Sequence, residues 1–146
     1  MRLVSLDVKN LNKYKIDPEM LQKAGRPCAL IIQLKYKGHR YDFAVPLRSN
    51  IHPSAPKDQY FPLPTRSTTK SGYRHGVHYI KMFPIDRTKT HKFYTNGMFY
   101  GMVKAILDKN EKQIIAECQD YLNRYEKGTR PPYCTDIDLI LEKLFK

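Results

Sequence analysis

Aromatic side chains alternate with cations through the middle of the sequence, and this pairing is typical of proteins that hold single-stranded RNA. Cations contact backbone phosphates, while aromatic rings stack on unpaired bases. No segment reads as a helix basic enough to enter a duplex groove, so RNA is favoured over DNA. The aromatic residues in question are Tyr36, Tyr41, Phe43, Tyr60, Phe61, Tyr73 and Tyr79.

The same residue types could also cleave RNA, since RNA carries its own nucleophile, the 2′-OH. A protein then has only to move protons and neutralise charge at the phosphate, which Lys, Arg, Ser, Thr and His can do without a metal or other cofactor. Phosphate-binding loops of nucleotide enzymes, zinc-protease motifs and serine-hydrolase elbows are absent. Carboxylates are too sparse in this region for a two-metal nuclease, and His75-x-x-His78 has no acid or cysteine nearby.

The positive charge is concentrated in one part of the chain. The 146 residues carry a net charge of +12, and residues 25–104 hold fourteen Lys or Arg against three Asp, a net of +11. Such concentration favours a polyanion-binding face over a merely solvated basic surface. The basic residues do not follow one amphipathic helix, so a membrane partner is not indicated.

The remaining composition favours one globular domain over residues 1–146, located in the cytoplasm. Mean hydropathy is −0.61, and no apolar run is long enough to span a bilayer. The N-terminus lacks the features of a signal peptide. Three cysteines without metal-ligand spacing fit free thiols in a reducing compartment.

Alternating apolar residues predict strands in the first two thirds. Leu30, Ile32 and Leu34 share one face of a strand over Cys28–Tyr36, and Lys37-Gly38 predicts a tight turn into a strand over His39–Leu47. The stretch Arg48–Gly76 has no clear period and predicts a long functional loop, with short strands around Tyr60–Leu63. Further strands are predicted over Arg2–Val8 and Val77–Phe83.

Helical spacing appears near the N-terminus and dominates the last third. A short helix is expected over Asp17–Ala24, one from about Met98 to Leu107, and one from about Asn110 to Lys127, stopped by Gly128. A capping box at Thr135–Asp138 predicts a last helix. The fold class is therefore α+β, with a mainly antiparallel sheet and a helical C-terminal third.

Several of these segments together resemble the type III toxin–antitoxin endoribonucleases. The matching segments are Gly25-Arg26-Pro27, the strand to Tyr36, Gly38-His39-Arg40-Tyr41, Val45-Pro46-Leu47-Arg48-Ser49 and Tyr79 to Ile85. The chain is similar to the ToxN, AbiQ, CptN and TenpN toxins, and most like CptN.

This resemblance implies a twisted antiparallel sheet with flanking helices, like the Kid/MazF toxins. It implies metal-independent cleavage of cellular RNA to a 2′,3′-cyclic phosphate. It also implies a small repeated pseudoknot RNA as antitoxin, which the toxin processes and with which it closes into a ring. The biological role implied is phage defence by abortive infection.

The resemblance also assigns candidate catalytic residues. Ser49 matches a family hydroxyl that would donate to a phosphate oxygen or pass a proton, and Arg48, in place of a second hydroxyl, would stabilise the charged transition state. The family lysine two residues later is Ile51 here, so His52 or Lys57 would act as the base. Arg26 would hold the scissile phosphate, or Lys23 if the register slips. The acid for the leaving group has no counterpart.

The other cations and one aromatic are candidates for RNA binding. Two alternatives stay open: a non-catalytic basic RNA-binding module, and a MazF-like toxin with a protein antitoxin. The candidate RNA-binding residues are Lys23, Arg40, Arg66, Lys70, Arg74, Tyr79, Lys81 and Lys89.

Overall fold

The computed structural model describes residues 2–6, 28–86, 90–92 and 98–144. The helix expected over Asp17–Ala24 lies outside the described residues. So do three candidate site residues, Lys23, Arg26 and Lys89.

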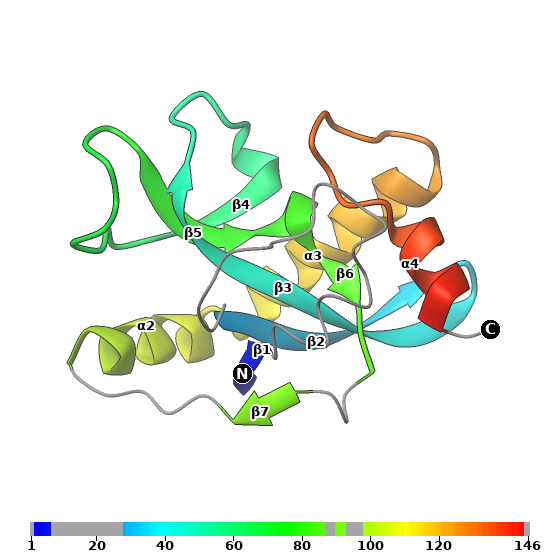
Figure 1. The fold of residues 1–146 in the computed structure, drawn as a ribbon, viewed down its shortest axis with the longest axis horizontal. Coiled ribbons are helices and arrows are strands. Elements are labelled where there is room, and N and C mark those ends of the chain that lie inside the picture. The colour runs from blue at the N-terminus through cyan, green and yellow to red at the C-terminus, as the bar shows by residue number, and fades with distance from the viewer. Residues whose placement is uncertain (1, 7–27, 87–89, 93–97, 145–146) are drawn as a thin grey trace.

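A long hairpin of β2 (Cys28–Tyr36) and β3 (His39–Ile51) crosses the middle of the molecule (Figure 1). Lys37 and Gly38 both have positive φ, +51° and +80°. Positive φ at both central positions is the requirement of the tight turn whose twist matches two antiparallel strands. The predicted turn and the predicted strand Cys28–Tyr36 are confirmed, while β3 runs four residues beyond the predicted end at Leu47.

The sheet has the order β4-β5-β3-β2-β1-β7, with β6 pairing with β3 beside this path, and every described pair is antiparallel. The strand predicted around Tyr60–Leu63 is confirmed. The strand predicted over Val77–Phe83 is wrong in its extent, because the chain turns through a 3-10 helix between β5 and β6. The strands not yet named are β1 (Arg2–Leu6), β4 (Tyr60–Leu63), β5 (Arg74–His78), β6 (Phe83–Pro84) and β7 (Thr90–Lys92).

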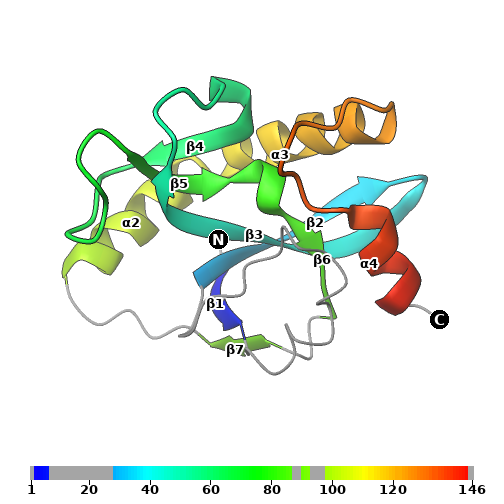
Figure 2. The same cartoon turned by 45° about the horizontal axis from the view of Figure 1, so that its top comes forward.

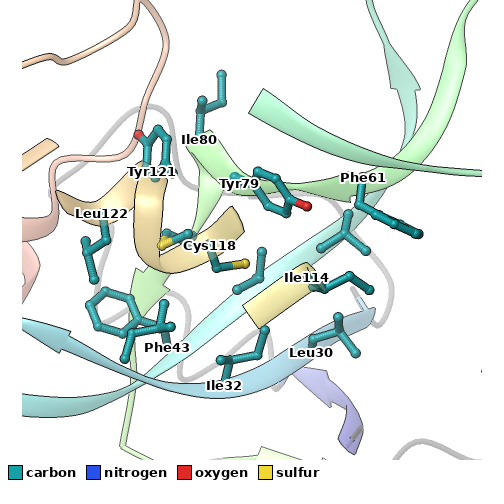
Figure 3. Packing of buried hydrophobic residues seen from close by; sticks show 14 of the residues in the cluster. Leu30, Ile32, Phe43, Phe61, Tyr79, Ile80, Ile114, Cys118, Tyr121 and Leu122 are labelled. Carbon is teal, nitrogen blue, oxygen red and sulfur yellow. The ribbon is translucent and has the colours of Figure 1, made fainter. Parts of the chain in front are cut away.

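Helices cover both faces of this sheet, as Figures 1 and 2 show. The helices are α2 (Met98–Lys109), α3 (Glu111–Glu126) and α4 (Ile137–Leu144). Side chains of α2 and α3 join Leu30, Ile32 and Phe43 in the larger core, part of which Figure 3 shows. On the other face a smaller core forms around Ala44, with Ile140 of α4 in it. The predicted α+β fold with an antiparallel sheet is confirmed.

The hairpin turn is fastened to α4 by a carboxylate that serves three donors. Asp138 accepts hydrogen bonds from the Tyr36 hydroxyl at 2.7 Å, from Lys37 Nζ at 3.0 Å and from Arg130 Nη2 at 2.8 Å. Burial alone would raise the pKa of Asp138, but these donors outweigh it and hold the pKa below its usual range. The predicted cap of α4 is corrected: Asp136 Oδ1, not Thr135, accepts the hydrogen bond from a first-turn backbone N–H, that of Leu139.

The other expectations for the last third hold where the structure describes them. Gly128 has φ +104°, and Thr129 N donates to Arg124 O at 2.9 Å, which is the glycine stop expected after α3. Cys118 and Cys134 are free thiols. Among the described helices none combines the length and the apolar character that crossing a bilayer needs.

Candidate functional site

A β-bulge in β3 separates the side chains that follow Leu47. Arg48 pairs with Gly76 of β5, but the next pair joins Ile51 to Arg74. Between these two pairs β3 therefore contains one residue more than β5, at Ser49-Asn50. A bulge bends the strand and re-aims its side chains. Arg48 and Ile51 consequently line one cavity.

Ser49 and Asn50 instead face the loop that precedes β5. Ser49 Oγ accepts a hydrogen bond from Arg66 Nη1 at 3.4 Å, and Asn50 Oδ1 accepts one from Lys70 N at 2.8 Å. The Arg66 guanidinium also lies over the ring of Tyr100, 5.4 Å from its centroid. The bulge therefore splits the predicted catalytic pair: Arg48 enters the cavity and Ser49 does not.

The second irregular segment is the 3-10 helix Tyr79–Lys81 between β5 and β6. In a continuous strand, residues three apart would point to opposite faces, whereas in a 3-10 turn they lie on the same side. His78 and Lys81 are three apart, and both line the cavity that contains Arg48. Tyr79 between them turns into the main core.

These segments, together with the loop before α4, line an open cavity of about 720 Å³. Its apolar wall comes from Ile51 and Ile80, and its charged groups are Arg48 and Lys81. No Asp or Glu is among the described residues that line it. The full lining is Arg48, Ile51, His52, Ser54, Ala55, Pro56, Gln59, His78, Ile80, Lys81, Pro132 and Tyr133.

His78 is the buried titratable group of this cavity. Its residue is only 7% exposed, and its Nδ1 has no hydrogen-bond partner within the described structure. Burial, and after it the charges of Arg48 and Lys81, lower the pKa of His78 to about 3. The ring is therefore neutral at pH 7 and keeps a nitrogen lone pair that can accept a proton.

His52 presents a different hydrogen-bonding state. Its Nδ1 accepts from Ser54 N at 3.1 Å and lies 2.6 Å from Ser54 Oγ. Because Nδ1 accepts a backbone N–H, the proton of the neutral ring sits on Nε2. The ring lies edge-on to Tyr73, with centroids 5.6 Å apart, so His52 is held in place although it is exposed.

Two histidines, two cations and no carboxylate make this cavity suited to an anion. An entering anion would be attracted by Arg48 and Lys81, and its charge would raise the pKa of His78 towards neutrality. The cavity therefore combines a place for a phosphate with a group whose proton affinity increases when the phosphate is there.

The whole chain, compared by structure, is similar to solved proteins that act with RNA. The lactococcal anti-phage endoribonuclease AbiQ, of a type III toxin–antitoxin system, aligns over 97% of this chain and 94% of its own, with 10% identity and a TM-score of 0.75. The chain has the fold of the type III toxin–antitoxin toxins. Two other solved structures, described in the next paragraph, have the same fold. The sequence itself matches no family model and no curated protein.

Two further structures share this toxin fold. One, from work on a processed non-coding RNA that regulates a bacterial antiviral system, has 15% identity, a TM-score of 0.73, and coverage of 98% of this chain and 96% of its own. The other comes from a bacterial type III system in which a non-coding RNA pseudoknot selectively inhibits the toxin; it has 13% identity, a TM-score of 0.68, and coverage of 97% and 94%. The expected closeness to CptN stays a prediction.

Three of the predicted site residues meet in the cavity: Arg48 and His52 as expected for catalysis, and Lys81, which was expected only to bind RNA. Lys57 lies on the 3-10 helix Lys57–Gln59 and is exposed, outside the lining. Their roles stay predictions, because placement alone does not test them.

The candidate RNA-binding residues divide into two groups. Arg66 and Lys70 belong to the loop that contacts Ser49 and Asn50, whereas Arg74, at the start of β5, pairs with Ile51. Arg40 is exposed near the hairpin turn, eight residues along β3 from Arg48, or about 26 Å at strand spacing.

Tyr79 was wrongly predicted to bind RNA. Its side chain is fully buried in the core, and its hydroxyl donates to Glu117 Oε1 at 2.7 Å, so no base can stack on it. Burial and this carboxylate also raise its pKa. The same reason removes most of the other aromatic candidates, because five of the seven are buried: Tyr36, Phe43, Tyr60, Phe61 and Tyr79.

Sequence reasoning missed two residues of the site, His78 and Tyr133. His78 was considered only as half of a metal pair with His75. The other member of that pair, His75, instead has its Nδ1 2.8 Å from the carbonyl oxygen of Pro64. For Tyr133, the signal available in the sequence was the pair of prolines directly before it, Pro131-Pro132. In the described part of the chain, no three His, Cys, Asp or Glu side chains converge as a metal site would require.

Proposed function

We propose that this chain is the toxin of a type III toxin–antitoxin system, an endoribonuclease that cleaves RNA without a metal ion. The likeness of the whole chain to AbiQ supports the class of activity. The observation that carries the proposal is the cavity in which Arg48, His78 and Lys81 meet His52 with no carboxylate among them. Phosphate oxygens need cations, and a 2′-OH needs an acceptor for its proton.

In this mechanism His78 is the base. Its neutral ring accepts the proton of the 2′-OH, and the nearby phosphate favours that step by raising the pKa of His78. Arg48 and Lys81 neutralise the charge that grows on the phosphate oxygens. The 2′-oxygen bonds to phosphorus as the bond from phosphorus to the 5′-oxygen breaks, and the leaving 5′-oxygen takes its proton from water. His52 donates a hydrogen bond from Nε2–H to the phosphate. The product is a 2′,3′-cyclic phosphate.

The first test is cleavage in EDTA by protein freed of bound RNA. We expect fragments whose 3′ ends become ligatable only after the cyclic phosphate is opened and removed. RNA that stays intact with excess protein contradicts the enzyme and leaves the alternative of a non-catalytic RNA-binding module.

The second test asks which side of the bulge carries the chemistry. Replacing the base in His78→Gln should lower the cleavage rate by about 100-fold or more, as loss of a general base commonly does. Ser49→Ala, on the other side, should change the rate much less. If Ser49→Ala causes the larger loss at unchanged folding, the reaction takes place on the Ser49 side and the assignment of the cavity is wrong.

The proposed antitoxin is a small repeated RNA folded as a pseudoknot, which the toxin cuts from its precursor and with which it assembles into a ring. The pseudoknot that inhibits the toxin of a structural neighbour supports this partner. Because cellular RNA would be the target, the proposed function places the protein in the cytoplasm. Co-expression with the repeat array should yield a defined protein–RNA complex. A partner that survives RNase digestion and proves to be protein would favour the MazF-like alternative.

A further inference from the structure

Tyr133, which lines the cavity, has a costly backbone conformation. It is 74% exposed, and no other Phe or Tyr among the described residues is exposed. Its φ is +65°, in the left-handed region that a side chain with a Cβ seldom adopts. Two prolines precede it, Pro131 and Pro132, and restrict the approach of the chain.

A buried cation holds this conformation. Lys81, itself only 6% exposed, donates a hydrogen bond from Nζ to the carbonyl oxygen of Tyr133. A second link joins the same segments, because Thr135 N donates to Ile80 O at 3.0 Å. The loop is thus fixed to the 3-10 helix that contains Lys81 and directly follows His78. The backbone that carries the exposed ring is therefore held at a fixed place beside the cavity.

We propose that the Tyr133 ring is the stacking platform for one unpaired nucleobase of the RNA whose phosphate lies between Arg48 and Lys81. This deepens the proposed function and rests on it, because it names the residue that selects single-stranded RNA at the same cavity. A π-surface beside two cations offers a nucleotide both of the contacts it needs, while a phosphate alone would use only the cations.

The surroundings fit a strand that continues past the ring. A second cavity of about 330 Å³ shares Pro56, Gln59 and Pro132 with the first and is lined by Arg124 and Arg130. Arg124 forms a long ion pair with Asp58 at 3.7 Å, and Arg130 is bound to Asp138. Arg48 and Lys81 line the first cavity and no described carboxylate does, whereas Asp58 lines the second. We therefore place the phosphate, and the nucleotide whose base stacks, in the first cavity.

The test measures binding of oligonucleotides of five nucleotides in which every ribose is 2′-O-methylated. The wild-type chain cannot cleave them, because the 2′-OH that would attack the phosphate is blocked. One oligonucleotide carries all its bases and a second is abasic at the central position. Tyr133→Gly keeps the carbonyl that Lys81 binds and suits the positive φ, yet it removes the ring. Tyr133→Phe keeps the ring, and Met98→Ala on α2 removes an exposed apolar side chain elsewhere.

Tyr133→Gly should weaken binding of the complete oligonucleotide by about 5- to 100-fold, the range expected for loss of one base–aromatic stack. Its binding of the abasic oligonucleotide should equal that of the wild type. Tyr133→Phe and Met98→Ala should bind both as the wild type does. The melting temperature of Tyr133→Gly should be equal to or higher than that of the wild type, since glycine relieves the backbone strain.

Equal losses for both oligonucleotides, no loss at all, or equally tight binding of a duplex would each overturn the stacking role. These outcomes are separable from failure of the proposed function. If Tyr133→Gly cleaves and binds RNA as the wild type does, the nuclease proposal stands and the stacking role of Tyr133 is wrong. If binding depends on Tyr133 but no RNA is cleaved, the stacking role stands and the nuclease proposal is wrong.

Discussion

At the scale of single residues, the cavity depends on a histidine that folding keeps uncharged. His78 would titrate near pH 6.5 in an unfolded chain, and its pKa in the folded protein is about 3. Between these values the unfolded state binds a proton that the folded state does not. Stability contributed by the neutral His78 is therefore complete above about pH 6.5 and is lost as pH falls towards the folded value.

This difference predicts a measurable loss of stability in mild acid. From pH 6.5 to pH 5 the free energy of unfolding should fall by on the order of 1 kcal/mol per pH unit through His78. Buried His75, whose pKa is also lowered by burial, adds in the same direction. Urea unfolding at several pH values measures the slope.

Two variants make this prediction specific. His78→Gln should flatten the slope, and His39→Gln, at an exposed position, should not. The range avoids the contribution of Asp138, whose lowered pKa makes its stabilisation disappear only below about pH 4. An identical slope in His78→Gln would show that His78 does not stay neutral in the folded chain.

At the scale of elements, the close approach of β4 to β5 supports the position of Arg48. Gly76 pairs with Arg48 on one side and with Pro62 on the other. A Cβ on Gly76 would lie 2.3 Å from the carbonyl oxygen of Phe61, which is backbone and cannot rotate away. The glycine therefore sets the spacing of strands at the edge of the site.

Gly76→Ala should therefore destabilise the fold by about 1–3 kcal/mol, the usual cost of inserting a methyl group into a packed region. Because Arg48 pairs with Gly76, the affinity of the cavity for RNA should also fall. Chemical unfolding and oligonucleotide binding measure the two effects.

Gly101→Ala is the matched control for this substitution. Gly101 lies in α2 with open space around its Cβ direction, so alanine should stabilise the helix by about 0.5–1 kcal/mol. Equal stability of Gly76→Ala and the wild type would mean that β4 moves away freely.

At the scale of the whole molecule, the two ends of the long hairpin differ in how their cations are used. Near the turn, Lys37 and Arg130 are bound to Asp138. Near the other end, Arg48 and Lys81 line a cavity without a carboxylate, and Arg74 is exposed at the start of β5. We therefore expect the phosphate backbone of a bound RNA to lie at the cavity end.

RNA binding should accordingly weaken steeply with salt. For single strands the slope of log K against log salt is about −0.7 for each neutralised phosphate. With a short oligonucleotide, Arg74→Ala should make the slope shallower by roughly that amount. Lys37→Ala, at the opposite end of the hairpin where Nζ is bound to Asp138, should leave the slope unchanged. A slope that neither variant alters would show that the strand follows another path.

Much of the fold could be read from periodic patterns. The strand Cys28–Tyr36, the turn at Lys37-Gly38 and the stop of α3 at Gly128 follow from local requirements, alternation in one case and positive φ in the others. The concentration of charge in residues 25–104 is likewise a property of the sequence alone. These features needed no knowledge of distant contacts.

The site was decided by the tertiary structure. A bulge at Ser49-Asn50 and a 3-10 turn at Tyr79–Lys81 interrupt the alternation of side chains along the strands. Neither irregularity produces a periodic pattern of residues by which the sequence could predict it. They turn Tyr79 into the core, although it was expected to contact RNA, and they place Lys81 in the same cavity as Arg48. Tyr133 lies 52 residues along the chain from Lys81, and long-range contacts bring it there: hydrogen bonds to Lys81 and Ile80, and the packing of α4 against the sheet. The sequence thus determined that a basic, strand-rich region exists, and folding determined which of its groups face one another.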